Sequence, residues 1–181
     1  MTVLKRADGE MTSSDQEVAD VFSEYFKEVY TVEDLSSIPT VPERDCNWKD
    51  IICFSEKIVF DKLQRLQSDK SPGPDGLHPM LLKECAATIA EPLSRIFQHS
   101  YNTGSLPEEW QIAHVVPIFK KGDRTNRENY RPVSLTCVSC KVMESIIKDV
   151  LVKHLEANKF LCKEQHGFRK GRSCLTNLET L

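Results

Sequence analysis

The sequence has no long hydrophobic run, and no stretch approaches the roughly 18 apolar residues that a membrane-spanning helix needs. The N-terminal residues Met1 to Arg6 also lack the apolar core of a secretory signal peptide. These absences argue against a membrane partner and against secretion. We therefore expect an intracellular protein, cytoplasmic or nuclear.

A disulfide framework is also missing. The chain has seven cysteines, an odd number, and they are scattered without regular spacing. This pattern fits a reducing compartment, and it predicts that most of the cysteines are small buried apolar side chains. We find no internal repeat and no low-complexity tract.

What the sequence does contain is enough apolar material for a core, with 40% hydrophobic and 28% charged residues in 181. The net charge of −3 conceals an asymmetry. Residues Ile112 to Cys174 carry thirteen Lys and Arg against six Asp and Glu, a balance of +7, so the remainder carries −10. A basic segment of this kind suits a phosphate-bearing partner, although a solvated surface of mixed charge would look the same.

Hydrophobic periodicity predicts a helix-rich α+β fold in two parts. Residues 1–47 would hold an amphipathic helix from Ser14 to Tyr30, with a capping box formed by Ser14 and Glu17, followed by a Pro-containing linker. Residues 48–181 would form the second part. Its helices are expected over Ser55–Ser68, from Pro79, through Pro92 to Gly104, over Ser139–Ala157 and after Ser173, with strands over Ala113–Lys121 and Tyr130–Leu135.

Three blocks stand out in this second part. The first is the strand pair, Val115–Asp123 with Asn129–Thr136, whose connecting turn is rich in Lys and Arg. The others are Ser71–Gly76 upstream and Gln165–Ser173 downstream. In this order the blocks resemble the fingers region of reverse transcriptases from LINE-type (non-LTR) retrotransposons, the jockey-like group in particular. The resemblance covers about Lys57 to Leu181.

The resemblance implies that these residues form the fingers and the first edge of the palm of a right-hand polymerase, with one basic β-hairpin and with the palm and thumb missing. In that family, hairpin cations clamp the triphosphate of the incoming nucleotide. The matching nucleotide-binding positions are Lys120 or Lys121 and Arg131, since positioned cations stabilise charge on phosphates. The alternative is that they are solvated hairpin cations.

Template binding is implied for the other basic and glycine-rich positions. Arg124 and Arg127 lie in the hairpin loop, where they could follow a nucleic-acid backbone or simply be solvated. The glycines of the Pro-Gly-Pro-Asp-Gly loop could let backbone amides approach a phosphate. Alternatively, the loop is an ordinary turn. The implied template-binding residues are Ser71, Gly73, Arg124, Arg127, Arg169, Lys170 and Arg172.

A zinc site is a competing interpretation, because Cys137, Cys140, Cys162 and His166 have spacings seen in such sites. The sequence context argues against it. Cys137 ends a strand, Cys140 begins an apolar-faced helix, and neither pair has Gly-rich flanks. We assign no metal-binding residue.

The sequence also lacks paired carboxylates that could be catalytic. Two-metal nucleotidyl transfer needs paired aspartates, which the family supplies from later palm strands. Asp61, Asp69, Asp123 and Asp149 match neither motif, so we assign no catalytic residue and expect no cofactor for this fragment. Mg²⁺ is expected for the complete family domain.

We therefore expect a truncated RNA-directed DNA polymerase domain, with an RNA template or RNA–DNA hybrid and dNTP as implied partners. On this view the chain alone is inactive. Two alternatives remain open: a non-catalytic nucleic-acid-binding module, and a retroelement remnant with no selected function.

Overall fold

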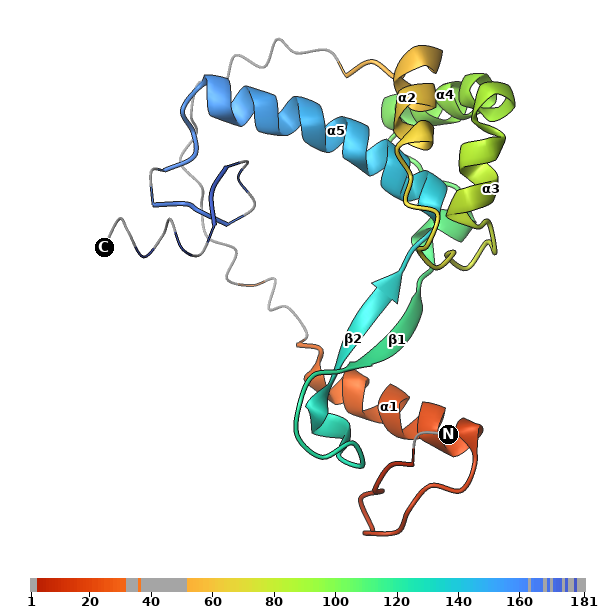
Figure 1. Ribbon diagram of the computed structural model, residues 1–181, viewed down its shortest axis with the longest axis vertical. Helices are drawn as coiled ribbons and strands as arrows, with labels where there is room; N and C mark the ends of the chain where they lie inside the picture. Colours follow the sequence, from red (N-terminus) through yellow and green to blue (C-terminus); the bar gives the residue numbers. More distant parts are fainter. Residues whose placement is uncertain are drawn as a thin grey trace. The chain divides into compact units, whose positions relative to one another are not determined.

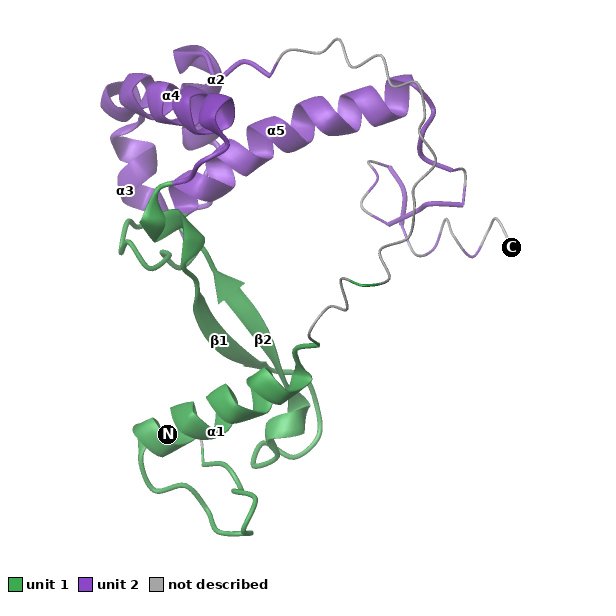
Figure 2. Ribbon diagram, turned by 180° about the vertical axis from the view of Figure 1, so that it is seen from behind, with its two compact units in different colours: residues 1–47, 70–78, 107–137 green, residues 48–69, 79–106, 138–181 purple. Residues whose placement is uncertain are grey.

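The computed structural model describes residues 3–31, 36, 52–162, 164–167, 169, 171–173, 175 and 178. It is helix-rich with one small antiparallel sheet, as expected for an α+β protein (Figure 1). Two compact units are present (Figure 2). Unit 1 contains Met1–Asn47, Lys70–His78 and Pro107–Cys137, and unit 2 contains Trp48–Asp69, Pro79–Leu106 and Val138–Leu181. Within the described residues, no helix is long and apolar enough to cross a membrane.

Two sequence predictions fall largely on residues outside this description. The linker over residues 31–47 is described only at Thr31 and Ser36, and the helix after Ser173 only at Leu175 and Leu178. The boundary between 1–47 and 48–181 lies in the same undescribed stretch, so that division stays a prediction.

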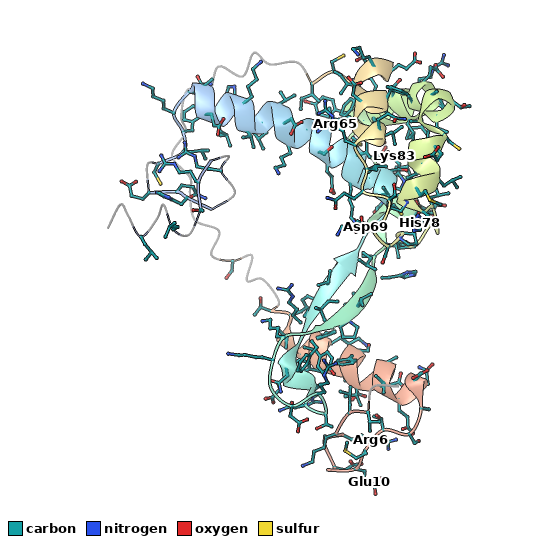
Figure 3. All side chains as sticks on the ribbon, viewed as in Figure 1. Arg6, Glu10, Arg65, Asp69, His78 and Lys83 are labelled. Atoms are coloured by element: carbon teal, nitrogen blue, oxygen red, sulfur yellow. The ribbon has the colours of Figure 1, made fainter. Side chains whose placement is uncertain are left out.

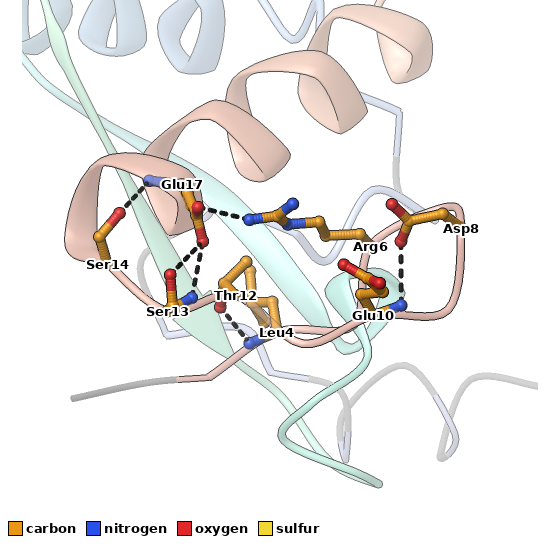
Figure 4. A network of polar contacts seen from close by, with 8 residues as sticks. All are labelled: Leu4, Arg6, Asp8, Glu10, Thr12, Ser13, Ser14 and Glu17. Atoms are coloured by element: carbon orange, nitrogen blue, oxygen red, sulfur yellow. Dashed lines mark hydrogen bonds and ion pairs between the residues drawn. The ribbon is translucent and has the colours of Figure 1, made fainter.

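Helix α1 (Asp15–Val29) begins where the capping signal predicts. The Ser14 hydroxyl accepts a hydrogen bond from the Glu17 amide at 3.2 Å. The return bond differs from the prediction, because the Glu17 carboxylate accepts from the Ser13 amide, at 2.6 Å, instead of from Ser14 (Figure 4). The first bond satisfies an amide that the first turn of a helix leaves without an intrahelical partner, and the second holds the residue that precedes the cap.

The sheet of unit 1 pairs β1 (His114–Phe119) with β2 (Tyr130–Leu135) in antiparallel register. The predicted hairpin is therefore confirmed. Short 3-10 turns, η2 (Glu108–Gln111) and η3 (Arg127–Asn129), precede each strand. In the described part of the chain each strand has only one partner, so both strands are edges.

An aromatic core joins α1 to the hairpin. The Phe22 ring meets the Tyr130 ring edge-on at 4.9 Å, and Tyr130 in turn meets Phe119 at 5.4 Å. The buried members of this cluster are Leu4, Val21, Phe22, Phe26 and Tyr130. α1 thus covers one face of the hairpin with its apolar side.

Unit 2 packs α2 (Glu56–Gln64) against α3 (Pro79–Glu84), α4 (Ala86–Thr103) and α5 (Val138–Ala157). The Phe54 ring meets the ring of the fully buried Phe97 at 5.9 Å. Lys62 of α2 lies 2.6 Å from the Asp149 carboxylate of α5. The buried apolar side chains of this unit are Ile52, Phe54, Val59, Leu63, Leu82, Ala86, Ala90, Phe97, Val138, Cys140, Val142, Met143 and Ile146.

Helix ends in unit 2 follow the sequence with one exception. α4 ends at Gly104, as predicted, and Gly104 has the left-handed conformation common for a C-terminal glycine. The sequence predicts that α2 reaches Ser68, but the helix ends at Gln64, because the amides of Arg65 and Leu66 bond to carbonyls three residues back. The end of α2 is tied to α3: Gln64 Nε2 donates to the Lys83 carbonyl at 3.1 Å, near the labelled Lys83 in Figure 3.

Candidate nucleic-acid interface

The register of the hairpin places two of the predicted cations on one face. Arg131 lies directly opposite Ile118. The Lys120 amide donates to the Asn129 carbonyl at 2.8 Å, which continues the pairing by one residue. Because side chains alternate along a strand and opposed residues share a face, Lys120 and Arg131 lie on the same side as diagonal neighbours, about 7–8 Å apart in such ladders. Both side chains are exposed.

The other face of the hairpin carries the residues that pack on α1. Phe119 and Tyr130 are directly opposed, and each is the chain neighbour of one cation. The cations are therefore backed by an aromatic layer and point away from it. Lys121 is also exposed, but it lies beyond the pairing at the start of the turn.

Two prolines face each other in the middle of the sheet, Pro117 and Pro132. Since Lys120 and Asn129 form a hydrogen-bonded pair, the antiparallel alternation makes Pro117–Pro132 a non-hydrogen-bonded pair. At such a pair, amide protons point outward, away from the partner strand. The ladder therefore loses nothing, and each outer edge has one donor fewer for pairing with another strand.

The turn between the strands is held by its own side chains. Gly122 has φ +90, and a Cβ there would lie 2.7 Å from the Asn129 side chain, so this position suits only glycine. Asn129 Nδ2 donates to the Asp123 carbonyl at 2.9 Å. The Thr125 amide donates to the Asp123 carboxylate at 2.9 Å, and this bond lowers the pKa of Asp123. The strand ends that carry Lys120 and Arg131 are therefore joined by an ordered turn.

The loop arginines are held against aromatic rings. The Arg124 guanidinium lies 4.6 Å from the centre of the Phe119 ring, and the Tyr130 hydroxyl donates to the Arg124 carbonyl at 2.8 Å. The Arg127 guanidinium lies 5.4 Å from the Tyr25 ring of α1 and 3.9 Å from the Glu28 carboxylate. Arg124 is exposed, whereas Arg127 is half-buried and forms an ion pair with Glu28. Sequence reasoning missed these ring contacts.

In the Pro-Gly-Pro-Asp-Gly loop, Gly73 is buried against the end of β2. A Cβ on Gly73 would lie 2.6 Å from the backbone of Thr136 and Cys137. A glycine is therefore needed here for two chain segments to cross closely, a role that the sequence did not reveal. Ser71 is exposed, and the Asp75 carboxylate accepts from the Leu77 amide at 3.1 Å, as a turn residue does.

The Gln165–Ser173 block belongs to unit 2 and is described apart from the hairpin. The Arg169 guanidinium donates to the carbonyls of Cys162 at 3.1 Å and Gln165 at 3.4 Å. Arg172 Nη1 lies 3.0 Å from Nε2 of the buried His166. Phe168 and Lys170 lie outside the described residues. Both arginines thus have partners within the block.

The cysteines of the zinc interpretation have other surroundings. The buried Cys137 thiol donates to the Glu109 carbonyl at 3.2 Å, and burial raises the pKa of Cys137. The Cys140 thiol lies 3.7 Å from the Glu144 carboxylate. A thiol with a raised pKa is a poor metal ligand, because the thiolate is the species that binds. The described residues include no group of three or more His, Cys, Asp or Glu side chains that could hold a metal ion.

Proteins to which this chain is similar come from transposable elements. No model of a protein family matches it. Over 110 residues the chain is 34% identical to a 115 kDa protein in the type-1 retrotransposable element R1DM of Drosophila melanogaster, covering 60% of the chain and 10% of that protein. It is 31% identical over 112 residues to the RNA-directed DNA polymerase from mobile element jockey of the same fly, covering 61% of the chain and 12% of the polymerase.

A longer match covers 96% of the chain at 27% identity. It is to a transposon BS protein of Drosophila melanogaster that carries the name of an RNA-directed DNA polymerase, and it covers 20% of that protein. The chain thus spans between a tenth and a fifth of the length of these relatives. The chain is accordingly homologous to one segment of the RNA-directed DNA polymerases of non-LTR retrotransposons.

Proposed function

We propose that the hairpin is the nucleotide-binding part of reverse transcriptase fingers. The observation that carries this proposal is the pair of exposed cations, Lys120 and Arg131, on one face of an ordered hairpin in a chain homologous to reverse transcriptases. A guanidinium can donate two parallel hydrogen bonds to phosphate oxygens, while the ammonium acts as a point charge. Together with Lys121, they can neutralise a triphosphate and hold it for reaction.

Template contacts extend this proposal to the neighbouring loops. Arg124 keeps an exposed guanidinium beside the hairpin, and Ser71 is exposed in the upstream loop. Both suit backbone contacts to an RNA template or an RNA–DNA hybrid, which carry no base information. Gly73 would contribute only indirectly, because its lack of a Cβ lets the Ser71–Gly76 loop pass close to the end of β2.

The remaining members of the proposed template set already have partners. Arg127 would have to share the Glu28 carboxylate, and Arg169 and Arg172 would have to exchange their contacts within the block. Lys170 completes the proposed set. In this proposal the Gln165–Ser173 block would lead from the fingers into the palm.

A second candidate function is nucleic-acid binding without catalysis. It is favoured by the structural partners of the aspartates. Asp61 lies 3.5 Å from Lys57, Asp149 pairs with Lys62, and Asp123 closes the hairpin turn. None of these carboxylates joins a metal-binding group in the described residues. Mg²⁺ would therefore be a cofactor of the complete family domain, with no ligands drawn from these three carboxylates.

Binding of nucleotide and RNA by the 181-residue chain tests the proposal. We expect Lys120→Ala and Arg131→Ala each to weaken binding of a fluorescent dNTP analogue by roughly tenfold to a hundredfold, because a charge-assisted hydrogen bond is worth about 1.5–3 kcal/mol. Lys153→Ala, which removes an exposed cation from α5, is the matched control. Unchanged affinity in both hairpin variants would rule out the nucleotide site.

Primer extension on an RNA template with Mg²⁺ tests whether the polypeptide is catalytic by itself, while the dNTP-binding measurement separates the two proposed functions. We expect RNA binding but no extension by this polypeptide, because two-metal nucleotidyl transfer needs clustered carboxylates and the described residues include no group of three or more His, Cys, Asp or Glu side chains that could hold a metal ion. Extension above that of a heat-inactivated sample would contradict this expectation.

A further inference from the structure

The N-terminal segment, residues 4–29, packs at the point of the hairpin where the cations lie. The Phe22 side chain is only 5% exposed and meets Tyr130, which meets Phe119. Those two rings are the chain neighbours of Arg131 and Lys120. Any shift of Tyr130 or Phe119 therefore moves the backbone that carries a cation.

The same segment contacts the turn at further points. The Lys5 amide donates to the Thr125 carbonyl at 2.8 Å, and the fully buried Leu4 completes the aromatic cluster. Tyr25 of α1 lies under the Arg127 guanidinium. The N-terminal segment thus holds both the strand ends and the turn between them.

An isolated two-stranded hairpin is marginally stable in water. Pro117 and Pro132 also remove outward donors, so a third strand would pair poorly with either edge of this one. In unit 1 the support of the hairpin therefore comes chiefly from its aromatic face. We infer that α1, through Phe22, is a positioning element that fixes Lys120 and Arg131 in the geometry needed to bind phosphates. This inference rests on the proposed phosphate role of the two cations.

The test compares two buried phenylalanines in the full chain. Phe22→Ala removes the support of the hairpin, and Phe97→Ala removes a ring of similar burial from α4 in unit 2. Hydrogen exchange of the amides of residues 118–131 reports the order of the hairpin. We expect exchange there to accelerate roughly tenfold or more in Phe22→Ala but not in Phe97→Ala, and Phe22→Leu to restore most of the protection.

Binding of a fluorescein-labelled single-stranded RNA at several salt concentrations measures how many phosphates the cations of the protein neutralise. The slope of log affinity against log salt falls by about 0.7 for each phosphate of a single strand that the protein no longer neutralises. We expect Phe22→Ala to reduce the slope by about 1.4, the change expected for the double variant Lys120→Ala/Arg131→Ala. A decrease in overall stability alone would leave this slope unchanged at temperatures where the chain is folded.

The outcomes separate this inference from the function on which it rests. If the double variant reduces the slope while Phe22→Ala keeps wild-type slope and exchange, the positioning role is wrong and the phosphate role stands. Faster exchange in Phe22→Ala with the slope unchanged in all variants would instead overturn the phosphate role and leave α1 as a structural support only. An equal reduction of the slope in Phe97→Ala would also overturn a specific role for Phe22.

Discussion

Unit 1 and unit 2 use helices for different purposes. In unit 2, α2 packs against α3, α4 and α5 through mainly aliphatic side chains, and the Lys62–Asp149 ion pair joins α2 to α5. In unit 1, α1 packs on a hairpin through aromatic rings. The cations of the proposed nucleotide site lie in the unit with the smaller core. Their position depends on a few ring contacts. Single substitutions in unit 1 should therefore disturb the geometry of the cations, whereas the larger losses of stability are expected in unit 2.

The largest expected effect is in unit 2. Phe97→Ala should lower the free energy of unfolding of this unit by about 3–5 kcal/mol, because the substitution removes a fully buried ring that packs on Phe54. Residue-resolved hydrogen exchange should show faster exchange in α2 and α4, and the least change in α1. Equal acceleration in α1 would break the comparison, since it would mean that both units unfold as one.

A smaller destabilisation is expected in unit 1 from Gly73→Ala. The new Cβ would lie 2.6 Å from the backbone of Cys137, so the loop or the end of β2 must move. Overpacking of this kind costs about 1–3 kcal/mol, measurable by urea unfolding followed through β2 amides. Gly167→Ala is the matched control, because no atom lies within 4 Å of its added Cβ. Equal stability of both variants would show that the close crossing at Gly73 relaxes freely.

The smallest effect concerns the start of α1. Arg6, at 2.5 Å, and the Ser13 amide lower the pKa of Glu17 to about 2 from an ordinary value of 4.5 (Figure 4). A lowered carboxyl pKa stabilises the fold fully above pH 4.5, and the contribution disappears as pH falls from 4.5 to about 2. Glu17→Gln should therefore reduce the urea midpoint of unit 1 at pH 7 and match the wild type near pH 2.

The partner variant sharpens this pH prediction. Arg6→Gln removes the main cause of the lowered pKa of Glu17. The change in urea midpoint caused by Glu17→Gln at pH 7 should therefore be smaller when Arg6→Gln is already present than in the wild-type chain. A pH dependence that survives Arg6→Gln in full would assign the lowered pKa to Ser13 alone.

Local features of both units could be predicted from the sequence. Apolar periodicity located α1 and α5, the Ser14 cap located a helix start, and two β-prone runs located the strands of the hairpin. These signals depend on neighbours within a few residues. The homology to retrotransposon reverse transcriptases was predicted in the same way, from the order of three short blocks.

Long-range partners could not be predicted. Periodicity identifies Phe22 as a core-facing side chain, but it does not say that the ring packs on Tyr130. In the same way, the turn chemistry of Ser71–Gly76 is visible in the sequence, while the crossing of Gly73 with Cys137 is not. The capping pattern also predicted the wrong donor for Glu17, because the amides of Ser13 and Ser14 are neighbours that compete for one carboxylate.

The distance in sequence between α1 and the hairpin has a consequence for synthesis on the ribosome. Tyr130 is added 108 residues after Phe22. At about 5–20 residues per second this is a delay of roughly 5–20 s. During that time the aromatic side of α1 has no hairpin to cover it, while α2, α3 and α4 of unit 2 are already made. A nascent chain stalled before Tyr130 would therefore offer Phe22 and Phe26 to chaperones, and release of that chaperone would mark completion of the hairpin.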